Sequence, residues 1–161
     1  MTAAKFNVCR RCRDETMNFL IVDDNAPMRR MIRTVIEDLA GEINECGDGA
    51  DAVANYAAHS PDWVLMDIRM KHTDGLTATK AVKARFADAK IIIVTNYDDA
   101  DLRESARAAG ACGYVLKENL FDMRRILTLC TEATSCCRNE VSFRQIRRAM
   151  TFFVRHSRLD K

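Results

Sequence analysis

Several features that mark other classes of protein are scarce or absent in this chain. Its 161 residues include two prolines and six glycines, with no low-complexity stretch that could link two folded domains. No apolar run approaches the roughly 20 residues of a membrane-spanning helix, and residues 1–15 contain no continuous apolar stretch typical of a secretory signal. We therefore expect one cytoplasmic domain without a membrane partner.

A charge excess of either sign is also missing. The 25 Lys and Arg against 23 Asp and Glu leave a net charge of +2, which gives no reason to expect a nucleic-acid partner. The seven cysteines are an odd number at irregular spacing, so we expect free thiols in a reducing compartment. Two cysteine pairs leave a metal ion open, although their spacing is poor for zinc: Cys9 with Cys12, and Cys136 with Cys137.

From residue 16 to about 133, short apolar runs alternate five times with longer segments of helical period. This alternation predicts an α/β fold, a doubly wound five-stranded parallel sheet with helices on both faces. The predicted strands are 18–22, 42–46, 63–66, 90–95 and 113–116. The predicted helices are 27–39, 48–59, 75–86, 98–109 and one that begins near residue 118.

The two ends of the chain differ from this pattern. Residues 1–15 form an N-terminal tail, and residues 134–140 read as a short polar link after the domain of residues 16–133. Residues 141–158 have the spacing of an amphipathic helix, and Arg138 to Lys161 carry seven Lys and Arg against two acids. We interpret residues 134–161 as an amphipathic, basic helical extension that docks or dimerises, because about 25 residues cannot form a helix-turn-helix domain.

Polar side chains follow the predicted strands at the edge where open α/β sheets bind ligands. Asp23 and Asp24 follow the first strand, and Asp67 follows the third. Thr95 ends the fourth strand, and Lys117 follows the fifth. Three carboxylates at one edge repel one another, and Mg²⁺ held by oxygen ligands is the simplest relief. A hydroxyl and an ammonium group beside them suit a phosphoryl group, with Asp67 as its nucleophile.

This arrangement resembles the receiver domain of two-component response regulators. Besides the strand-end residues, Asp74 and Gly75 shortly after Asp67 carry the resemblance. The intervals between Asp23, Asp67, Thr95 and Lys117 are 44, 28 and 22 residues, which is similar to the family. The resemblance covers residues 16 to about 133 and implies a (βα)5 flavodoxin-like receiver fold, here with an extra C-terminal helix.

The resemblance implies a phosphorylation switch. Asp67 would accept a phosphoryl group from a histidine kinase or a histidine phosphotransfer protein. Mg²⁺ or Mn²⁺ would be held by Asp24, by Asp67 and by the main-chain carbonyl of Arg69. Asp23 would hold the ion through water, and Lys117 would pair with the phosphoryl oxygens. The chain would then catalyse only its own aspartyl phosphorylation and dephosphorylation, as a signalling switch rather than an enzyme.

The resemblance also implies how the phosphorylated state is read. Thr95 would move to hydrogen-bond the phosphoryl group, and Tyr114 would turn inward to fill the space that it left. The fourth helix, fifth strand and fifth helix would then change shape, and an unidentified downstream protein would bind there. A homodimer is a further form that the output could take.

The sequence departs from the family near Asp67. Asn96 stands where a small residue is usual, so we expect a narrower path to the phosphoacceptor. Arg69 and Tyr97 lie at positions where, in the family, the side chain affects how quickly the phosphoryl group is lost. Their bulk predicts slow hydrolysis of the aspartyl phosphate. On the first helix, Arg29 and its neighbours Arg30 and Arg33 are expected to face either the phosphodonor or solvent.

Other functions stay open. The segment 113–117 looks like receivers of DNA-binding transcriptional regulators, so the chain could be such a receiver without its helix-turn-helix domain. A phosphorylation-independent binding module and a nucleic-acid module acting through the basic C-terminal helix are further alternatives. An aspartate-nucleophile phosphatase is disfavoured, because Arg69 stands where such enzymes place a general acid.

Overall fold

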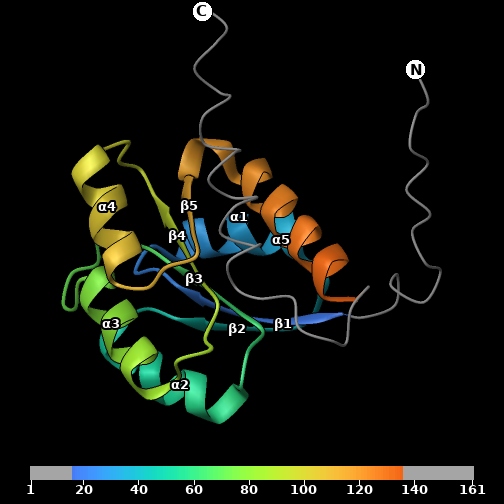
Figure 1. Ribbon diagram of the computed structural model, residues 1–161, viewed down its shortest axis with the longest axis horizontal. Coiled ribbons are helices and arrows are strands. Elements are labelled where there is room, and N and C mark those ends of the chain that lie inside the picture. Colours follow the sequence, from blue (N-terminus) through green and yellow to red (C-terminus); the bar gives the residue numbers. More distant parts are fainter. Residues whose placement is uncertain (1–15, 136–161) are drawn as a thin grey trace, which may run out of the picture. The chain divides into compact units, whose positions relative to one another are not determined.

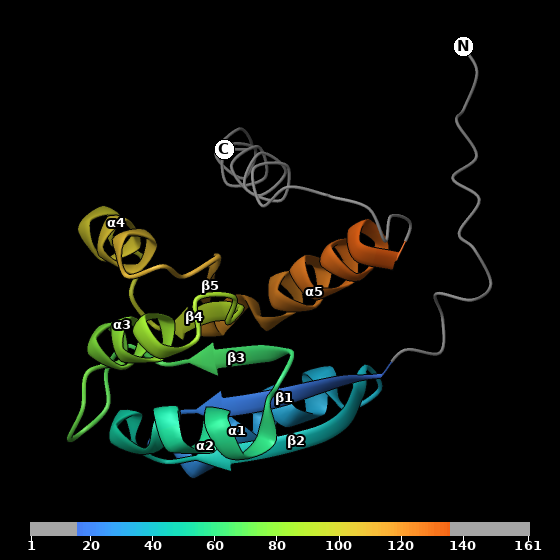
Figure 2. The same ribbon diagram turned by 60° about the horizontal axis from the view of Figure 1, so that its bottom comes forward.

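The computed structural model describes residues 16–135, with side chains from 16 to 127. Thr16–Arg124 form one compact unit. It contains a five-stranded parallel sheet in the order β2-β1-β3-β4-β5, which confirms the predicted doubly wound α/β fold (Figure 1). The arrowheads of β1, β2 and β3 point the same way in Figure 2. The strands are β1 (Met17–Val22), β2 (Ala40–Cys46), β3 (Trp63–Met66), β4 (Ile91–Thr95) and β5 (Gly113–Leu116).

Helices connect the strands, and asparagine or aspartate side chains cap three of them by accepting a hydrogen bond from a backbone amide. The capping residues are Asn25 at α1, Asp74 at α3 and Asp99 at α4. Among the described residues no helix combines the length and apolar character needed to span a bilayer. The helices are α1 (Ala26–Ile36), α2 (Ala52–His59), α3 (Gly75–Arg85), α4 (Ala100–Ala108) and α5 (Leu120–Ser135), with short 3-10 turns η2 (Gly49–Asp51) and η3 (Lys117–Asn119).

The two faces of the sheet bury alternate residues of the central strands. Figure 1 shows α2, α3 and α4 on one side of the sheet and α1 on the other. The core under α2, α3 and α4 includes Leu20, Val22, Val64, Met66, Ile91, Ile93, Ala78, Val82 and Ala106. The intervening strand residues Phe19, Ile21, Leu65 and Ile92 are also fully buried, as are Ile32 and Ile36 of α1. Both faces are covered, which explains strands without polar alternation.

The end of α1 differs from the prediction. The apolar spacing extends the helix to Leu39, but the helix ends at Ile36. Leu39 instead lies in a turn, where its amide donates to the Ile36 carbonyl at 2.9 Å and its own carbonyl accepts from Met17 at 3.0 Å. That bond starts the pairing of β1 with β2, so both strands begin earlier than predicted.

Several further boundaries differ by a few residues, two of them with a clear cause or consequence. The predicted second helix begins with the 3-10 turn η2, because the Asp48 side chain accepts from the Ala50 amide and tightens the first turn. Thr134 and Ser135, expected in a polar link, are the last residues of α5. Cys46 is a free thiol, as predicted. The N-terminal tail, the extension from residue 136 onward and the four cysteines with metal-binding potential lie outside the described residues.

Candidate functional site

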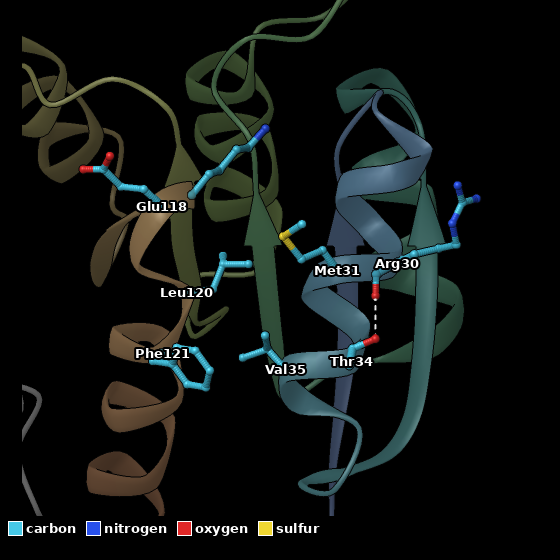
Figure 3. A pocket seen from close by; sticks show the side chains of 8 residues that line it. Arg30, Met31, Thr34, Val35, Glu118, Leu120 and Phe121 are labelled. Carbon is cyan, nitrogen blue, oxygen red and sulfur yellow. Dashed lines mark hydrogen bonds between the residues drawn. The ribbon is translucent and has the colours of Figure 1, made fainter.

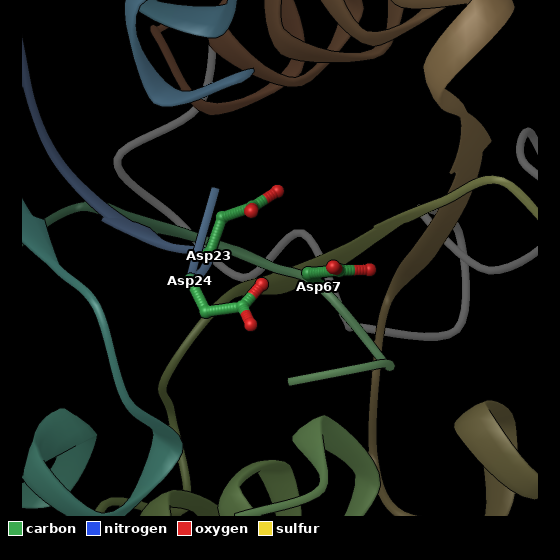
Figure 4. Close-up of side chains that lie close together, drawn as sticks. All are labelled: Asp23, Asp24 and Asp67. Atoms are coloured by element: carbon green, nitrogen blue, oxygen red, sulfur yellow. The ribbon is translucent and has the colours of Figure 1, made fainter. Parts of the chain in front are cut away.

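Three carboxylates meet at the carboxyl edge of the sheet. Asp23, Asp24 and Asp67 each place a carboxylate oxygen within 4.8 Å of the other two (Figure 4). Val22 pairs in register with Met66, so the residues that follow these two strands leave the sheet side by side. The exposed fractions of Asp23 and Asp67 are 1% and 5%, whereas Asp24 is half-buried. The sequence prediction that these acids converge is confirmed.

Lys117 is the buried cation of this cluster. Its Nζ lies 2.7 Å from Asp23 Oδ2 and 2.8 Å from Asp67 Oδ2. Burial acts to lower the pKa of Lys117, but the two carboxylates outweigh burial, and the pKa is raised. Lys117 therefore stays positively charged at neutral pH and offsets part of the negative charge at this edge.

At Asp67, in contrast to Lys117, burial has a larger effect on the pKa than the neighbouring charges. Burial raises the pKa of the Asp67 carboxyl, the hydrogen bond and charge of Lys117 lower it, and the Asp23 charge raises it again. The net shift is upward, because burial outweighs the lysine. Three acids against one lysine leave an excess of negative charge in a buried place, and carboxylate oxygens are the ligands that Mg²⁺ and Mn²⁺ prefer. These residues fit a divalent cation.

Thr95 adds a hydroxyl group at the end of β4. Thr95 is fully buried, and its Oγ1 has no hydrogen-bond partner among the described residues. A buried hydroxyl in this state is costly unless another group binds to it. The site therefore combines carboxylates, an ammonium group and an available hydroxyl, which suits a negatively charged group with several oxygens.

Comparison with known proteins agrees with this geometry. Residues 19–130 match the family model of the response regulator receiver domain. The chain belongs to this family.

Named relatives include both short and longer response regulators. Chemotaxis protein CheY of Bacillus subtilis is 40% identical over 109 residues, which are 67% of this chain and 89% of CheY. Response regulator UvrY of Escherichia coli O6:H1 is 39% identical over 103 residues, 63% of this chain and 47% of UvrY. The crystal structure of a LuxR-family two-component response regulator from Aurantimonas sp. SI85-9A1 matches with a TM-score of 0.68 and 27% identity, covering 74% of this chain and 87% of that one.

Three residues that the resemblance singles out, Arg69, Tyr97 and Tyr114, are linked by contacts with one another. The guanidinium carbon of Arg69 lies 5.3 Å from the ring centre of Tyr97, which joins the loops after β3 and β4. The half-buried Tyr114 donates its hydroxyl hydrogen bond to the main-chain carbonyl of Tyr97 at 2.7 Å. Asn96, expected to narrow the path to Asp67, is exposed. The roles that the resemblance implies for these residues remain predictions.

One residue at this edge of the receiver domain was not assigned to the site from the sequence. Arg29 was expected to face a partner or solvent, but its Nη1 donates to the main-chain carbonyl of Asp23 at 2.7 Å, and its Nε donates to Glu45 at 3.0 Å. The available signal was its position six residues after Asp23, in the first half of a helix that starts beside the acids.

An apolar groove lies next to the site, between α1 and the start of α5 (Figure 3). Its volume is about 510 Å³, and Met31 and Phe121 on its walls are 54% and 75% exposed. Lys117 lines the groove and also pairs with Asp23 and Asp67, so the groove adjoins the acid cluster. Its walls are formed by Arg30, Met31, Thr34, Val35, Lys117, Glu118, Leu120 and Phe121.

Proposed function

We propose that this receiver domain is a phosphorylation-dependent switch in which Asp67 accepts a phosphoryl group from the phosphohistidine of a histidine kinase or histidine phosphotransfer protein. The observation that carries the proposal is the buried Asp67 carboxylate, held 2.8 Å from Lys117 and within 4.8 Å of the Asp23 and Asp24 carboxylates. The switch would work in a signalling chain and not on an external substrate.

The chemistry follows from the residues around Asp67. A carboxylate oxygen of Asp67 attacks phosphorus, the bond from phosphorus to the donor imidazole nitrogen breaks, and that nitrogen keeps the electron pair. Lys117 then pairs with the phosphoryl oxygens, and the Thr95 hydroxyl donates a hydrogen bond to one of them. Water later attacks the acyl phosphate, and inorganic phosphate leaves.

Asp23, Asp24, Asp67 and the Arg69 carbonyl would hold Mg²⁺ or Mn²⁺. The bound ion supplies positive charge that offsets the negative charge of the phosphoryl oxygens. Asp23 already has several partners, because its Oδ1 accepts from the Asn25 amide at 2.8 Å and its Oδ2 pairs with Lys117. We therefore assign Asp23 contact with the ion through water.

The output lies on the surface formed by α4, β5 and α5. Thr95 and Tyr114 would couple the phosphoryl group to that surface, because Tyr114 already contacts the loop that follows Thr95 through the Tyr97 carbonyl. An unidentified downstream protein or a second copy of the chain would bind there.

A second candidate is the receiver part of a DNA-binding transcriptional regulator. It is favoured by UvrY, of which this chain matches 47%, and by the LuxR-family structure. A coding sequence that continues past Lys161 into a helix-turn-helix segment would support this candidate, and a stop codon there would exclude it.

The test of the proposed function is the intact mass of the protein after incubation with acetyl phosphate and Mg²⁺. We expect one added phosphoryl group in the wild type, none in Asp67→Asn and none after chelation of the metal. Asp62→Asn is the matched control, because Asp62 lies just before β3, where it accepts from the Asn18 amide, and should be labelled normally. An unlabelled wild type, or a labelled Asp67→Asn, would contradict the proposal.

A further inference from the structure

The peptide that joins the two adjacent acids is fixed from several sides. The Asp23 amide donates to the Cys46 carbonyl at 3.1 Å, which ties this residue to the end of β2. The Asp23 carbonyl accepts from Arg29 Nη1 at 2.7 Å. That carbonyl and the Asp24 amide belong to one planar peptide group. A hydrogen bond to the carbonyl oxygen therefore also helps to fix the position of the Asp24 Cα atom, from which its side chain extends.

Arg29 is itself held in place by a carboxylate. Its Nε donates to Glu45 Oε2 at 3.0 Å, and the two side chains are 19% and 26% exposed. A guanidinium group is a rigid fork that can donate in two fixed directions, here toward the carboxylate and the main-chain carbonyl. Arg29 thus connects α1, the end of β2 and the loop that carries both acids.

The Glu45 carboxylate also offsets the positive charge of Arg29. Arg29 brings a positive charge close to a place where we propose a divalent cation, and Glu45 offsets that charge. Arg33 shares Glu45, with its Nε at 2.9 Å, but its second hydrogen bond goes to the Ile43 carbonyl of β2 at 3.3 Å. Arg33 therefore has the same ion-pair partner as Arg29 without a hydrogen bond to the acid loop.

We propose that Arg29 is a positioning residue for the divalent-cation site, which fixes the peptide between Asp23 and Asp24 so that both carboxylates face Asp67. Glu45 holds Arg29 in the required orientation. The inference rests on the proposed function, since it concerns the same cation site. Groups that orient metal ligands typically change affinity by about 10- to 100-fold when removed.

The test measures Mn²⁺ binding, from the electron paramagnetic resonance signal of the free ion, without any phosphodonor. We expect Arg29→Gln to raise the dissociation constant for Mn²⁺ about tenfold. Arg29→Lys should recover part of the loss, because one ammonium group can still donate to the Asp23 carbonyl. Arg33→Gln is the matched control and should stay within about twofold of the wild type. Thermal unfolding of each variant shows whether it is folded.

The outcomes separate this inference from the proposed function. Unchanged Mn²⁺ binding by a folded Arg29→Gln, or equal losses in Arg29→Gln and Arg33→Gln, would overturn the positioning role while Asp67 is still phosphorylated. A wild type that neither binds Mn²⁺ nor takes up phosphate would overturn both. If Arg29→Gln does not fold, Arg29→Lys and Glu45→Gln carry the test: weaker Mn²⁺ binding supports the inference, and unchanged binding overturns it.

Discussion

The guanidinium group of Arg103 lies over the ring of Tyr114, with its central carbon 4.5 Å from the ring centre. The same group donates to Asp98 Oδ1 from Nε at 3.1 Å and from Nη2 at 2.7 Å. Arg103 therefore joins α4 to β5 within the surface that we propose as the output of the switch.

This contact predicts a change in the titration of Tyr114. Burial raises the pKa of the Tyr114 hydroxyl, and the Arg103 charge opposes that shift. Arg103→Met keeps an apolar chain over the ring and removes the charge, so the pKa of Tyr114 should rise further. Absorbance titration measures it, with Tyr114→Phe to assign the signal. Arg107→Met, which removes an ion pair with Glu104 on the same helix, should leave Tyr114 unchanged. A lower pKa in Arg103→Met would contradict this explanation.

The Arg69 and Tyr97 pair predicts the lifetime of the phosphorylated state. The two side chains connect the loop that carries Asp67 to the loop after β4, and we expect them to slow the approach of water. A cation–π contact contributes about 1 kcal/mol, so replacing both residues by Ala should speed loss of the phosphoryl group about fivefold. Phosphate release after removal of acetyl phosphate measures the rate. His72→Ala, an exposed residue of the same loop, is the control. Equal lifetimes in all three proteins would exclude a shielding role.

The groove between α1 and the start of α5 predicts that a substitution in it slows phosphoryl transfer from a protein donor but not from a small-molecule donor. A protein donor that reaches Asp67 would cover the groove, because Lys117 lies in both places. Phe121→Glu, at a side chain that is 75% exposed, should slow transfer from a phosphohistidine protein about tenfold, the effect of ~1.4 kcal/mol of lost contact. Labelling by acetyl phosphate should not change, since the small donor needs no docking. Ala81→Glu, at an exposed position of α3, controls for the added negative charge. Equal slowing with both donors would argue against docking here.

Removal of the Asp67 charge should stabilise the protein in chelator at neutral pH. Burial raises the pKa of the Asp67 carboxyl above its usual value of 3.8. The protonated carboxyl therefore stabilises the folded state below pH 3.8, and this stabilisation is lost as the pH rises through the pKa of the folded protein. Asp67→Asn should therefore melt at a higher temperature than the wild type near pH 7, by roughly 4 °C for each 1 kcal/mol. The difference should shrink near pH 3. Lys117→Met, which leaves two buried acids unpaired, should melt lower. An unchanged melting temperature of Asp67→Asn would contradict the burial cost.

Glu45 should show the opposite pH dependence. Burial acts to raise its pKa, but Arg33 and Arg29 outweigh burial and lower it below the usual 4.5. Its contribution to stability is therefore present above pH 4.5 and lost as pH falls through the folded pKa. Glu45→Gln should lower the free energy of unfolding by about 1 kcal/mol at pH 7 and change it little at pH 3, as measured by urea unfolding. A loss that is the same at both pH values would mean that packing, and not charge, explains it.

Some elements were predictable to the residue because burial alone determines them. Trp63–Met66 and Gly113–Leu116 are short apolar runs between polar residues, and both form strands with those bounds. The end of α1 was not predictable from spacing. Leu39 fits the helical period, but the pairing of β1 with β2 uses its carbonyl, and local periodicity carries no information on that contact.

The same distinction holds for the site. Strand ends bring together the acids and Lys117, because parallel strands deliver their ends to one edge. Contacts to main-chain carbonyls were not predictable, since any residue supplies a carbonyl: Arg29 reaches Asp23 in this way, and Tyr114 reaches Tyr97. The close approach of the Gly75 backbone to the Asp67 carbonyl is another contact that was not predictable. A Cβ on Gly75 would overlap the Asp67 carbonyl oxygen, so the backbone of α3 can start there only with glycine.

The strand order also determines when the charges of the site meet during biosynthesis. Asp23 and Asp24 follow the first strand and Asp67 the third, whereas Lys117 follows the last. A ribosome therefore delivers all three acids before their buried lysine, and β1 and β3 can pair as neighbours in the sheet while β5 is still unmade. Until then the three acids repel one another at one edge of the sheet, and addition of β5 completes the hydrogen bonding of β4 and brings the lysine that offsets part of this charge.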